Sequence, residues 1–107
     1  MLLFKKKFLP AIRAGEKTQT VRLWKHRRMK TGQRSYIPGA GYIQVDAVDE
    51  VRLDELTDED ARRDGFASVE LLRSEITQLY HDQLTDGYRA YRVIFHTVAK
   101  ETVSEPP

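Results

Sequence analysis

The sequence has 107 residues, of which 40% are hydrophobic and 32% are charged, and its formal net charge is +2. This composition indicates one globular domain and excludes an intrinsically disordered chain. The sequence has no cysteine, which excludes disulfides, zinc–thiolate sites and a cysteine nucleophile, and no apolar run approaches the roughly 18 residues of a membrane-spanning helix.

The small net charge hides an uneven distribution of charge along the chain. Residues 1–36 contain eleven of the 18 basic residues but one of the 16 acidic residues, so this segment carries +10 and the remainder −8. Such an asymmetry is typical of a protein surface that binds an anion, most often nucleic acid. The alternative is that basic and acidic segments lie side by side in the fold and neutralise each other.

The N-terminal segment "MLLFKKKFLP" has no long apolar stretch after its lysines. A secretory signal peptide needs such a stretch, so we expect a cytoplasmic protein. Leu2–Phe4 is predicted to form a short first strand. Pro10 suits the first turn of a short helix, where its missing N–H group costs no hydrogen bond, and Gly15 suits the end of that helix.

The segment "KTQTVRLW" is predicted to form a strand in which polar side chains are unusually dense. Alternation places Val21 and Leu23 on one face. The other face carries Thr20, Arg22 and Trp24, and is therefore either a solvated surface or a site. Trp24 either stacks on a nucleobase or covers the edge of the core.

Two further strands are predicted at Ser35–Ile37 and Tyr42–Leu53, separated by the turn sequence "PGAG". In the longer strand, Ile43 and Val45 share one phase of the alternation, whereas Val48 fits the other. We therefore expect a bulge or bend near Val48, of the kind that curves a sheet into a barrel.

The next segment is predicted to form two helices. Thr57 suits the N-cap of the first, because three acidic residues follow it in the first turn, and Gly65 suits its end. Ser68 suits the N-cap of the second helix, whose apolar stripe predicts packing against a core. The stripe consists of Val69, Leu72, Ile76, Leu79 and Tyr80.

A last strand is predicted at Tyr88–Val98, and the polar segment after it indicates a flexible tail. The chain is thus predicted to be a single domain at residues 1–98 with a tail at residues 99–107. About five strands with helices inserted between them predict the α+β class, as a small curved β-sheet or β-barrel flanked by helices.

One segment matches a recognisable signature. "GEKTQTVRLW" contains the pattern G-x-K-x-x-T-x-R, whose fixed positions are Gly15, Lys17, Thr20 and Arg22. By this pattern the chain resembles the ASCH domain family. Three further blocks, "KTGQR", "LTDEDARRDGFASVELLRSEI" and "YRVIFHTV", follow in the family's order, so the resemblance covers roughly residues 2–98.

The resemblance implies a β-barrel like that of PUA domains, with a cleft under the signature, and a function in binding RNA or nucleosides. Some small bacterial members are amidohydrolases that remove the acetyl group from N4-acetylcytidine, and at least one member is described as a ribonuclease. In the deacetylases a lysine and a threonine of the signature act together with a glutamate from the following helical region. The matching residues here are Lys17, Thr20 and Asp64, so the carboxylate is kept on a side chain one methylene shorter.

These three residue types could perform hydrolysis under one condition. A threonine hydroxyl is a weak nucleophile unless a base takes its proton. A lysine with an ordinary pKa of about 10.4 is protonated at pH 7, so Lys17 needs burial or a nearby cation such as Arg22 to lower its pKa. Asp64 could position the amine or transfer a proton. Backbone N–H groups after Gly15 are candidates for stabilising the oxyanion.

Two classes of function compete. In the first, which the shorter carboxylate and the extended basic loop favour, the cleft is a binding module for RNA or a modified nucleoside. Basic side chains would then contact phosphates while Trp24 or Tyr42 stacks on a base. In the second, the protein is an amidohydrolase with Lys17, Thr20 and Asp64 as its catalytic residues. The candidate binding residues are Lys5, Lys7, Arg22, Trp24, Lys25, Arg27, Arg28 and Lys30.

We expect no cofactor and no metal, because the three histidines are scattered along the sequence and indicate no ligand cluster. For the same reason nothing argues independently for a ribonuclease, the third alternative. The expected partner is RNA or a modified nucleoside rather than a membrane, and a monomer is the favoured state.

Overall fold

The computed structural model describes residues 2–80, 82 and 86–99. The strands of this part of the chain are β1 (Gln19–Trp24), β2 (Arg34–Ile37), β3 (Gly41–Val51) and β4 (Arg89–Val98). Its helices are α1 (Leu9–Arg13), α2 (Asp58–Asp64) and α3 (Val69–Leu79), with short 3-10 helices at Lys6–Phe8 and Leu53–Glu55.

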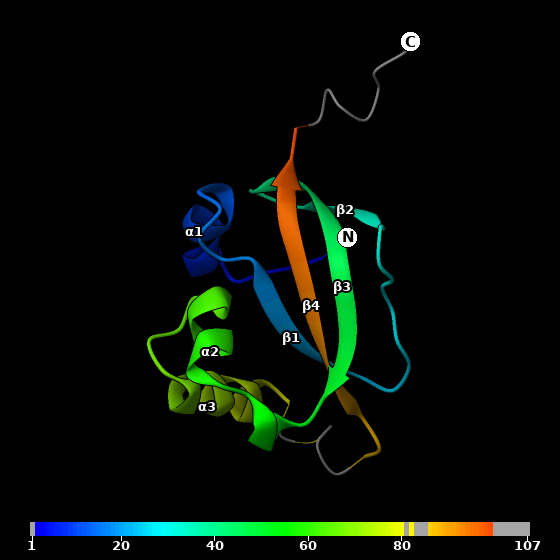
Figure 1. Cartoon of the computed structure of the whole chain (residues 1–107), viewed down its shortest axis with the longest axis vertical. Coiled ribbons are helices and arrows are strands. Elements are labelled where there is room, and N and C mark those ends of the chain that lie inside the picture. Colours follow the sequence, from blue (N-terminus) through cyan, green and yellow to red (C-terminus); the bar gives the residue numbers. More distant parts are fainter. Residues whose placement is uncertain (1, 81, 83–85, 100–107) are drawn as a thin grey trace.

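The four strands form one antiparallel sheet in the order β1-β4-β3-β2. The last strand, β4, lies between β1 and β3, and the sheet curls into a half-barrel that stays open between β1 and β2 (Figure 1). All three α-helices lie on the β1 side of the sheet in this view, α1 near one end and α2 and α3 near the other. The α+β class with a small curved sheet is thereby confirmed.

Leu2–Phe4 forms no strand, so the prediction of a first strand is wrong. The Leu2 N–H group donates to the carbonyl of Tyr36 in β2 at 3.1 Å, but the 3-10 helix at Lys6–Phe8 follows at once and ends any ladder. The segment is apolar because two of its side chains contribute to the core: Leu2 is buried in the core, and Phe4 packs against the core.

A bulge at Asp46 interrupts β3, two residues from the predicted position at Val48. The pairing with β4 shifts register between Val45 and Ala47. The extra residue brings Val48 back into phase with Val45, and both side chains enter the same buried cluster. The change of phase in the sequence is thus explained by a bulge that curves the sheet.

The ends of α2 and α3 follow the predicted capping rules. Thr57 and Asp60 form a capping box, in which each side chain accepts a hydrogen bond from the other residue's backbone N–H group, at 3.2 Å and 3.0 Å. Gly65 ends α2 with a φ of +91°, a left-handed conformation that favours glycine. Ser68 caps α3 by accepting from the N–H group of Leu71.

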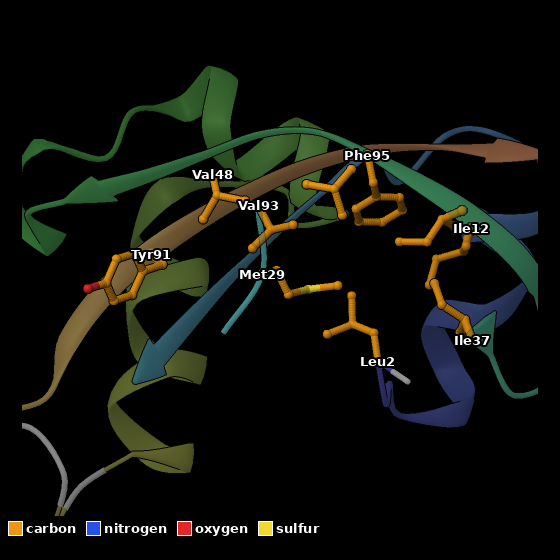
Figure 2. Close-up of a cluster of buried hydrophobic side chains, with 10 residues drawn as sticks. Leu2, Ile12, Met29, Ile37, Val48, Tyr91, Val93 and Phe95 are labelled. Carbon is orange, nitrogen blue, oxygen red and sulfur yellow. The ribbon is translucent and has the colours of Figure 1, made fainter. Parts of the chain in front are cut away.

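The sheet buries an apolar cluster on each face. Figure 2 shows the first, in which Val93 and Phe95 of β4 point into the same space as Met29 and Leu2. The remaining members of this cluster are Ile12, Ile37, Ile43, Val45, Val48 and Tyr91. The second cluster packs α2 and α3 against the opposite face and consists of Val21, Leu23, Leu56, Ala61, Val69, Leu72, Ile76 and Ala90.

The apolar stripe of α3 is only partly core. Val69, Leu72 and Ile76 are buried as predicted, but Leu79 is 50% exposed. Leu79 lies at the end of α3, where it lines a pocket instead of the core. The predicted tail follows β4, and apart from Ala99 it lies outside the described residues.

Candidate functional site

The signature begins at a turn that directs Lys17 into the domain. Helix α1 ends in a Schellman motif, in which the Glu16 N–H group donates to the carbonyl of Ala11 at 2.8 Å and the Gly15 N–H group to that of Ile12 at 3.1 Å. Gly15 has a φ of +78°, which a residue with a side chain adopts only at a cost. The N–H group of Lys17 also bonds Ala11, at 3.1 Å. This turn fixes the backbone just before β1.

Lys17 and Asp64 form a buried ion pair between residues that lie far apart in the sequence. The residues are 2% and 3% exposed, and Nζ lies 2.5 Å from Oδ1. Nζ also donates to the backbone carbonyl of Asp64, at the C-terminal end of α2, where the helix dipole favours a cation. The second carboxylate oxygen, Oδ2, is buried without a hydrogen-bond partner among the described residues. A buried acceptor of this kind is costly and indicates that a ligand or water belongs there.

Three phenylalanine rings surround the amine of Lys17. Nζ lies 4.7 Å from the ring centroid of Phe8, 5.6 Å from that of Phe4 and 5.9 Å from that of Phe66. The rings keep water away from the amine and attract its positive charge through their faces. The predicted catalytic lysine therefore lies in an apolar environment.

Thr20 and Arg22 lie on one face of β1, beside the ion pair. Arg22 donates from Nε to Oγ1 of Thr20 at 3.0 Å and from Nη2 to the carbonyl of Leu3 at 2.7 Å. Its guanidinium also lies over the ring of Phe4, 4.7 Å from the centroid. Because Oγ1 accepts the hydrogen bond from Arg22, the hydroxyl hydrogen of Thr20 remains available to a base.

Lys17, Thr20, Arg22 and Asp64 line one pocket of about 360 Å³, which we call the signature pocket. Its other lining residues are Leu3, Phe4, Lys5, Phe8, Val21, Phe66, Leu72, Glu75, Ile76, Leu79 and Tyr80. Small-molecule sites have volumes of this order, with mainly apolar walls and a few polar groups. The structure thus brings the three residues predicted as catalytic into one pocket.

Burial shifts the pKa values of the ion pair towards its neutral forms. Desolvation, the largest influence, lowers the pKa of Lys17 below the usual 10.5; the charge of Asp64 opposes this shift and that of Arg22 adds to it. Desolvation likewise raises the pKa of Asp64 above 3.8, against the attraction of both cations. The neutral amine of Lys17 is therefore easier to form than that of an exposed lysine, which is the condition for a lysine base.

Several solved structures share this architecture, among them the three that follow. The hypothetical protein PH0355 superposes with a TM-score of 0.74 at 19% identity, covering 90% of this chain and 95% of its own. Protein EF3133 from Enterococcus faecalis, of family DUF984, superposes with a TM-score of 0.72 at 14% identity, covering 92% of this chain and 72% of the other. An ASCH domain from Lactobacillus crispatus superposes with a TM-score of 0.69 at 12% identity, covering 82% of this chain and 68% of the other. This chain has the ASCH-domain fold.

No family model and no curated protein sequence matches the chain. In this fold the turn of the signature and the start of β1 lie opposite the end of α2. Lys17 and Asp64 therefore come into contact. At these identities the likeness shows the fold alone.

Sequence reasoning missed Glu75 as a residue of the signature pocket. Glu75 belongs to α3, lines the pocket and pairs with Lys5 across it, with Nζ and Oε2 2.8 Å apart. This hydrogen bond from Lys5 is the main cause that lowers the pKa of Glu75. The sequence did contain a signal for it: Glu75 lies between Leu72 and Ile76, so its spacing places this charged residue within the apolar stripe of α3.

The eight predicted binding residues divide into groups. Lys5 and Arg22 line the signature pocket, and Arg22, Trp24 and Arg28 line a neighbouring pocket of about 260 Å³. The other four line neither pocket. Lys7 lies over the ring of Phe8, Lys25 over that of Tyr88, Arg27 donates to the carbonyl of Val48, and Lys30 is exposed.

The two aromatic candidates also have separate environments. Trp24 stacks on Tyr91, with centroids 5.4 Å apart and planes at 30°, and it packs against the first core cluster. It therefore covers the core while one part of it lines the neighbouring pocket. Tyr42 packs against Tyr36 and lines a different pocket together with Arg13, so it does not share the signature pocket.

In the described part of the chain, no group of three histidine or acidic side chains is placed to hold a metal ion. None of its helices is long and apolar enough to span a bilayer.

Proposed function

We propose that the signature pocket binds a modified nucleoside and hydrolyses an acyl group from its exocyclic amine, as in the conversion of N4-acetylcytidine and water into cytidine and acetate. The observation that carries this proposal is the buried Lys17–Asp64 pair at the wall of an aromatic-lined pocket that also contains Thr20 and Arg22. A mainly apolar pocket of about 360 Å³ has the volume of a small planar ligand such as a nucleoside.

Lys17 acts as the base and Thr20 as the nucleophile. The neutral amine of Lys17 takes the hydroxyl proton of Thr20, and Oγ1 forms a bond to the carbonyl carbon of the acyl group. Arg22, which holds Oγ1, orients the attacking oxygen and its charge favours the alkoxide. The tetrahedral intermediate then collapses: the C–N bond breaks, and the departing amine receives the proton from the ammonium of Lys17.

Water completes the cycle. Lys17 removes a proton from water, the resulting hydroxide attacks the threonyl ester, and the C–O bond to Thr20 breaks. The proton returns from Lys17 to Oγ1, and the carboxylic acid is released and loses its remaining proton to solvent. Asp64 positions the amine throughout, and its Oδ2, which has no partner among the described residues, accepts the N–H group of the substrate amide.

This mechanism requires Lys17 to move. In the described structure, the hydrogen bonds of Nζ go to the carboxylate and the backbone carbonyl of Asp64. Substrate that bonds the carboxylate of Asp64 competes with Lys17 and frees its neutral amine, whose lone pair then accepts the hydroxyl proton of Thr20. Catalytic hydrogen bonds often form only in the complex with substrate.

The test is incubation of the pure protein with N4-acetylcytidine, followed by chromatography. We expect cytidine and acetate from the wild type and none from Thr20→Val, which removes the hydroxyl at nearly constant shape. Thr18→Val is the matched control, because Thr18 lies just before β1 and does not line the pocket. An intact substrate after prolonged incubation with folded wild-type protein would exclude this activity.

A binding module without catalysis is the second candidate. The observation that favours it is the direction of the Lys17 hydrogen bonds, which is also that of a purely structural ion pair. Saturable binding of cytidine or RNA without turnover would distinguish this candidate from the enzyme. A ribonuclease stays a third prediction, which degradation of labelled RNA would test.

A further inference from the structure

The neighbouring pocket adjoins the signature pocket directly. The two share Leu3 and Arg22, and the neighbouring pocket continues along the chain to Trp24, Arg28 and Gln33. One guanidinium, that of Arg22, thus borders both spaces. A single ligand long enough to pass Arg22 would occupy both.

Strand geometry gives the direction of such a ligand. Thr20, Arg22 and Trp24 are alternate residues of β1, and Thr20 and Arg22 lie opposite Val93 and Tyr91 of β4 on the same face. Alternate residues on one face lie about 6.6 Å apart, so the row from Thr20 to Trp24 spans about 13 Å. This length is comparable with that of a nucleotide, from the exocyclic amine of its base to its phosphate.

The neighbouring pocket is cationic, whereas the signature pocket contains both signs of charge. Arg22 and Arg28 line the former, which has no acidic residue among its described lining residues. The signature pocket holds the carboxylates of Asp64 and Glu75. The neighbouring pocket therefore favours an anionic group, and the signature pocket, on the other side of Arg22, favours an uncharged base with N–H donors.

Arg28 has its donors available for a ligand. It is exposed, and it forms no ion pair or side-chain hydrogen bond with the residues described in the structure. Arg22 uses Nε and Nη2 for Thr20 and Leu3, which leaves Nη1. Guanidinium groups with free N–H donors match the geometry of phosphate oxygens better than any other side chain.

We propose that the neighbouring pocket binds a phosphate group of the substrate, with Arg28 as its principal ligand and Arg22 between phosphate and base. The placement of the base rests on the proposed function. The substrate class is then a nucleotide, either a nucleoside monophosphate or a nucleotide within RNA, rather than a free nucleoside. Trp24, stacked on Tyr91, forms the apolar wall of this phosphate pocket.

The experiment compares unreactive probes by equilibrium binding. Trp24 is the one tryptophan of the chain, so its fluorescence reports directly on the phosphate pocket. The probes are cytidine, cytidine 5′-monophosphate, cytidine 3′-monophosphate and a short oligocytidylate. We expect at least one phosphate-bearing probe to bind about tenfold more tightly than cytidine, ~1.4 kcal/mol, with the gain falling as salt rises.

Arg28→Gln should abolish the gain from phosphate while leaving the affinity for cytidine unchanged. Arg52→Gln removes the same charge from an exposed residue after β3 that pairs with Asp54, and it should keep the gain. Tighter binding of a monophosphate identifies a free nucleotide as the ligand, and a gain confined to the oligonucleotide identifies RNA. Either result supports the phosphate pocket if it depends on Arg28.

Two results would overturn the inference: equal affinity of the wild type for cytidine and for every phosphate-bearing probe, or a gain that survives in Arg28→Gln. Because the probes carry no acyl group, this outcome is independent of the chemistry. Hydrolysis of N4-acetylcytidine without any phosphate gain refutes the phosphate pocket alone. An Arg28-dependent gain without hydrolysis refutes the amidohydrolase and keeps the pocket.

Discussion

Arg22 donates a 3.0 Å hydrogen bond from Nε to Oγ1 of Thr20, two residues earlier on β1, and its charge also lowers the pKa of Lys17. One guanidinium thus orients the proposed nucleophile and helps to keep the proposed base neutral. These two effects have different experimental signatures, because orientation affects the maximal rate and charge affects its dependence on pH.

Arg22→Met should therefore change two measured quantities. Activity requires neutral Lys17, so kcat/KM rises with pH through the lowered pKa of this residue and levels off below the ordinary 10.5. Loss of Arg22 removes one cause of the lowering, so the midpoint moves to higher pH. The plateau also falls, about 10- to 100-fold, because Oγ1 is no longer held. An unchanged midpoint would show that Arg22 does not act on Lys17.

Asp64→Asn should move the same pKa in the opposite direction. The negative charge of Asp64 raises the pKa of Lys17 against the desolvation that lowers it, so the neutral amide leaves desolvation unopposed. Titration of carbon-13-labelled lysine by NMR measures this pKa without needing activity. We expect a value lower than in the wild type; a higher one would contradict the buried position of the pair.

Asp64→Glu should keep the activity or raise it. The side chain retains its charge and gains the methylene that the resembling deacetylases possess at this position. Kinetics with N4-acetylcytidine provide the measurement, and Asp58→Glu at the exposed start of α2 is the matched control. Loss of activity together with a wild-type melting temperature would show that the shorter arm is essential in this chain.

Leu72→Ala should reduce the free energy of unfolding by about 2–5 kcal/mol, as truncation of a buried leucine does. Leu72 is 2% exposed in the cluster between α3 and the sheet, whereas its neighbour Leu71 is 54% exposed. Leu71→Ala, the control on the same helix, should cost less than about 0.5 kcal/mol. Urea unfolding of both variants decides the matter, and similar losses would contradict the assignment of the core face.

Gly15→Ala should lose activity out of proportion to its loss of stability. A methyl group at Gly15 meets no atom within 4 Å, so its cost is that of a φ of +78°, about 1–2 kcal/mol. Gly87 has a φ of +80° and equally open surroundings, so Gly87→Ala should cost about the same. Thermal unfolding and hydrolysis rates together separate the effects. If both variants are equally active, the turn does not position Lys17.

Several features of this protein were predictable because they depend on neighbours in the sequence. The caps at Thr57 and Ser68 and the stop at Gly65 require hydrogen bonds or dihedral angles within a few residues. The bulge in β3 was predictable because side chains of a strand alternate between its two faces, so the extra residue changes the phase of the apolar pattern in the sequence. The signature was visible for the same reason, since its four positions lie within eight residues.

Only the tertiary structure decided what surrounds these groups. The resemblance to the ASCH family pointed to Lys17 and Asp64, but their burial and 2.5 Å contact depend on packing α2 against β1. Leu79 and Glu75 show the same limit in opposite ways. Leu79 is half exposed because it lies at the end of α3, beyond the last buried residue Ile76, whereas Glu75 lines the pocket from a position between two buried residues. A periodic pattern identifies the face of a helix, but solvent exposure depends on which distant segments cover that face.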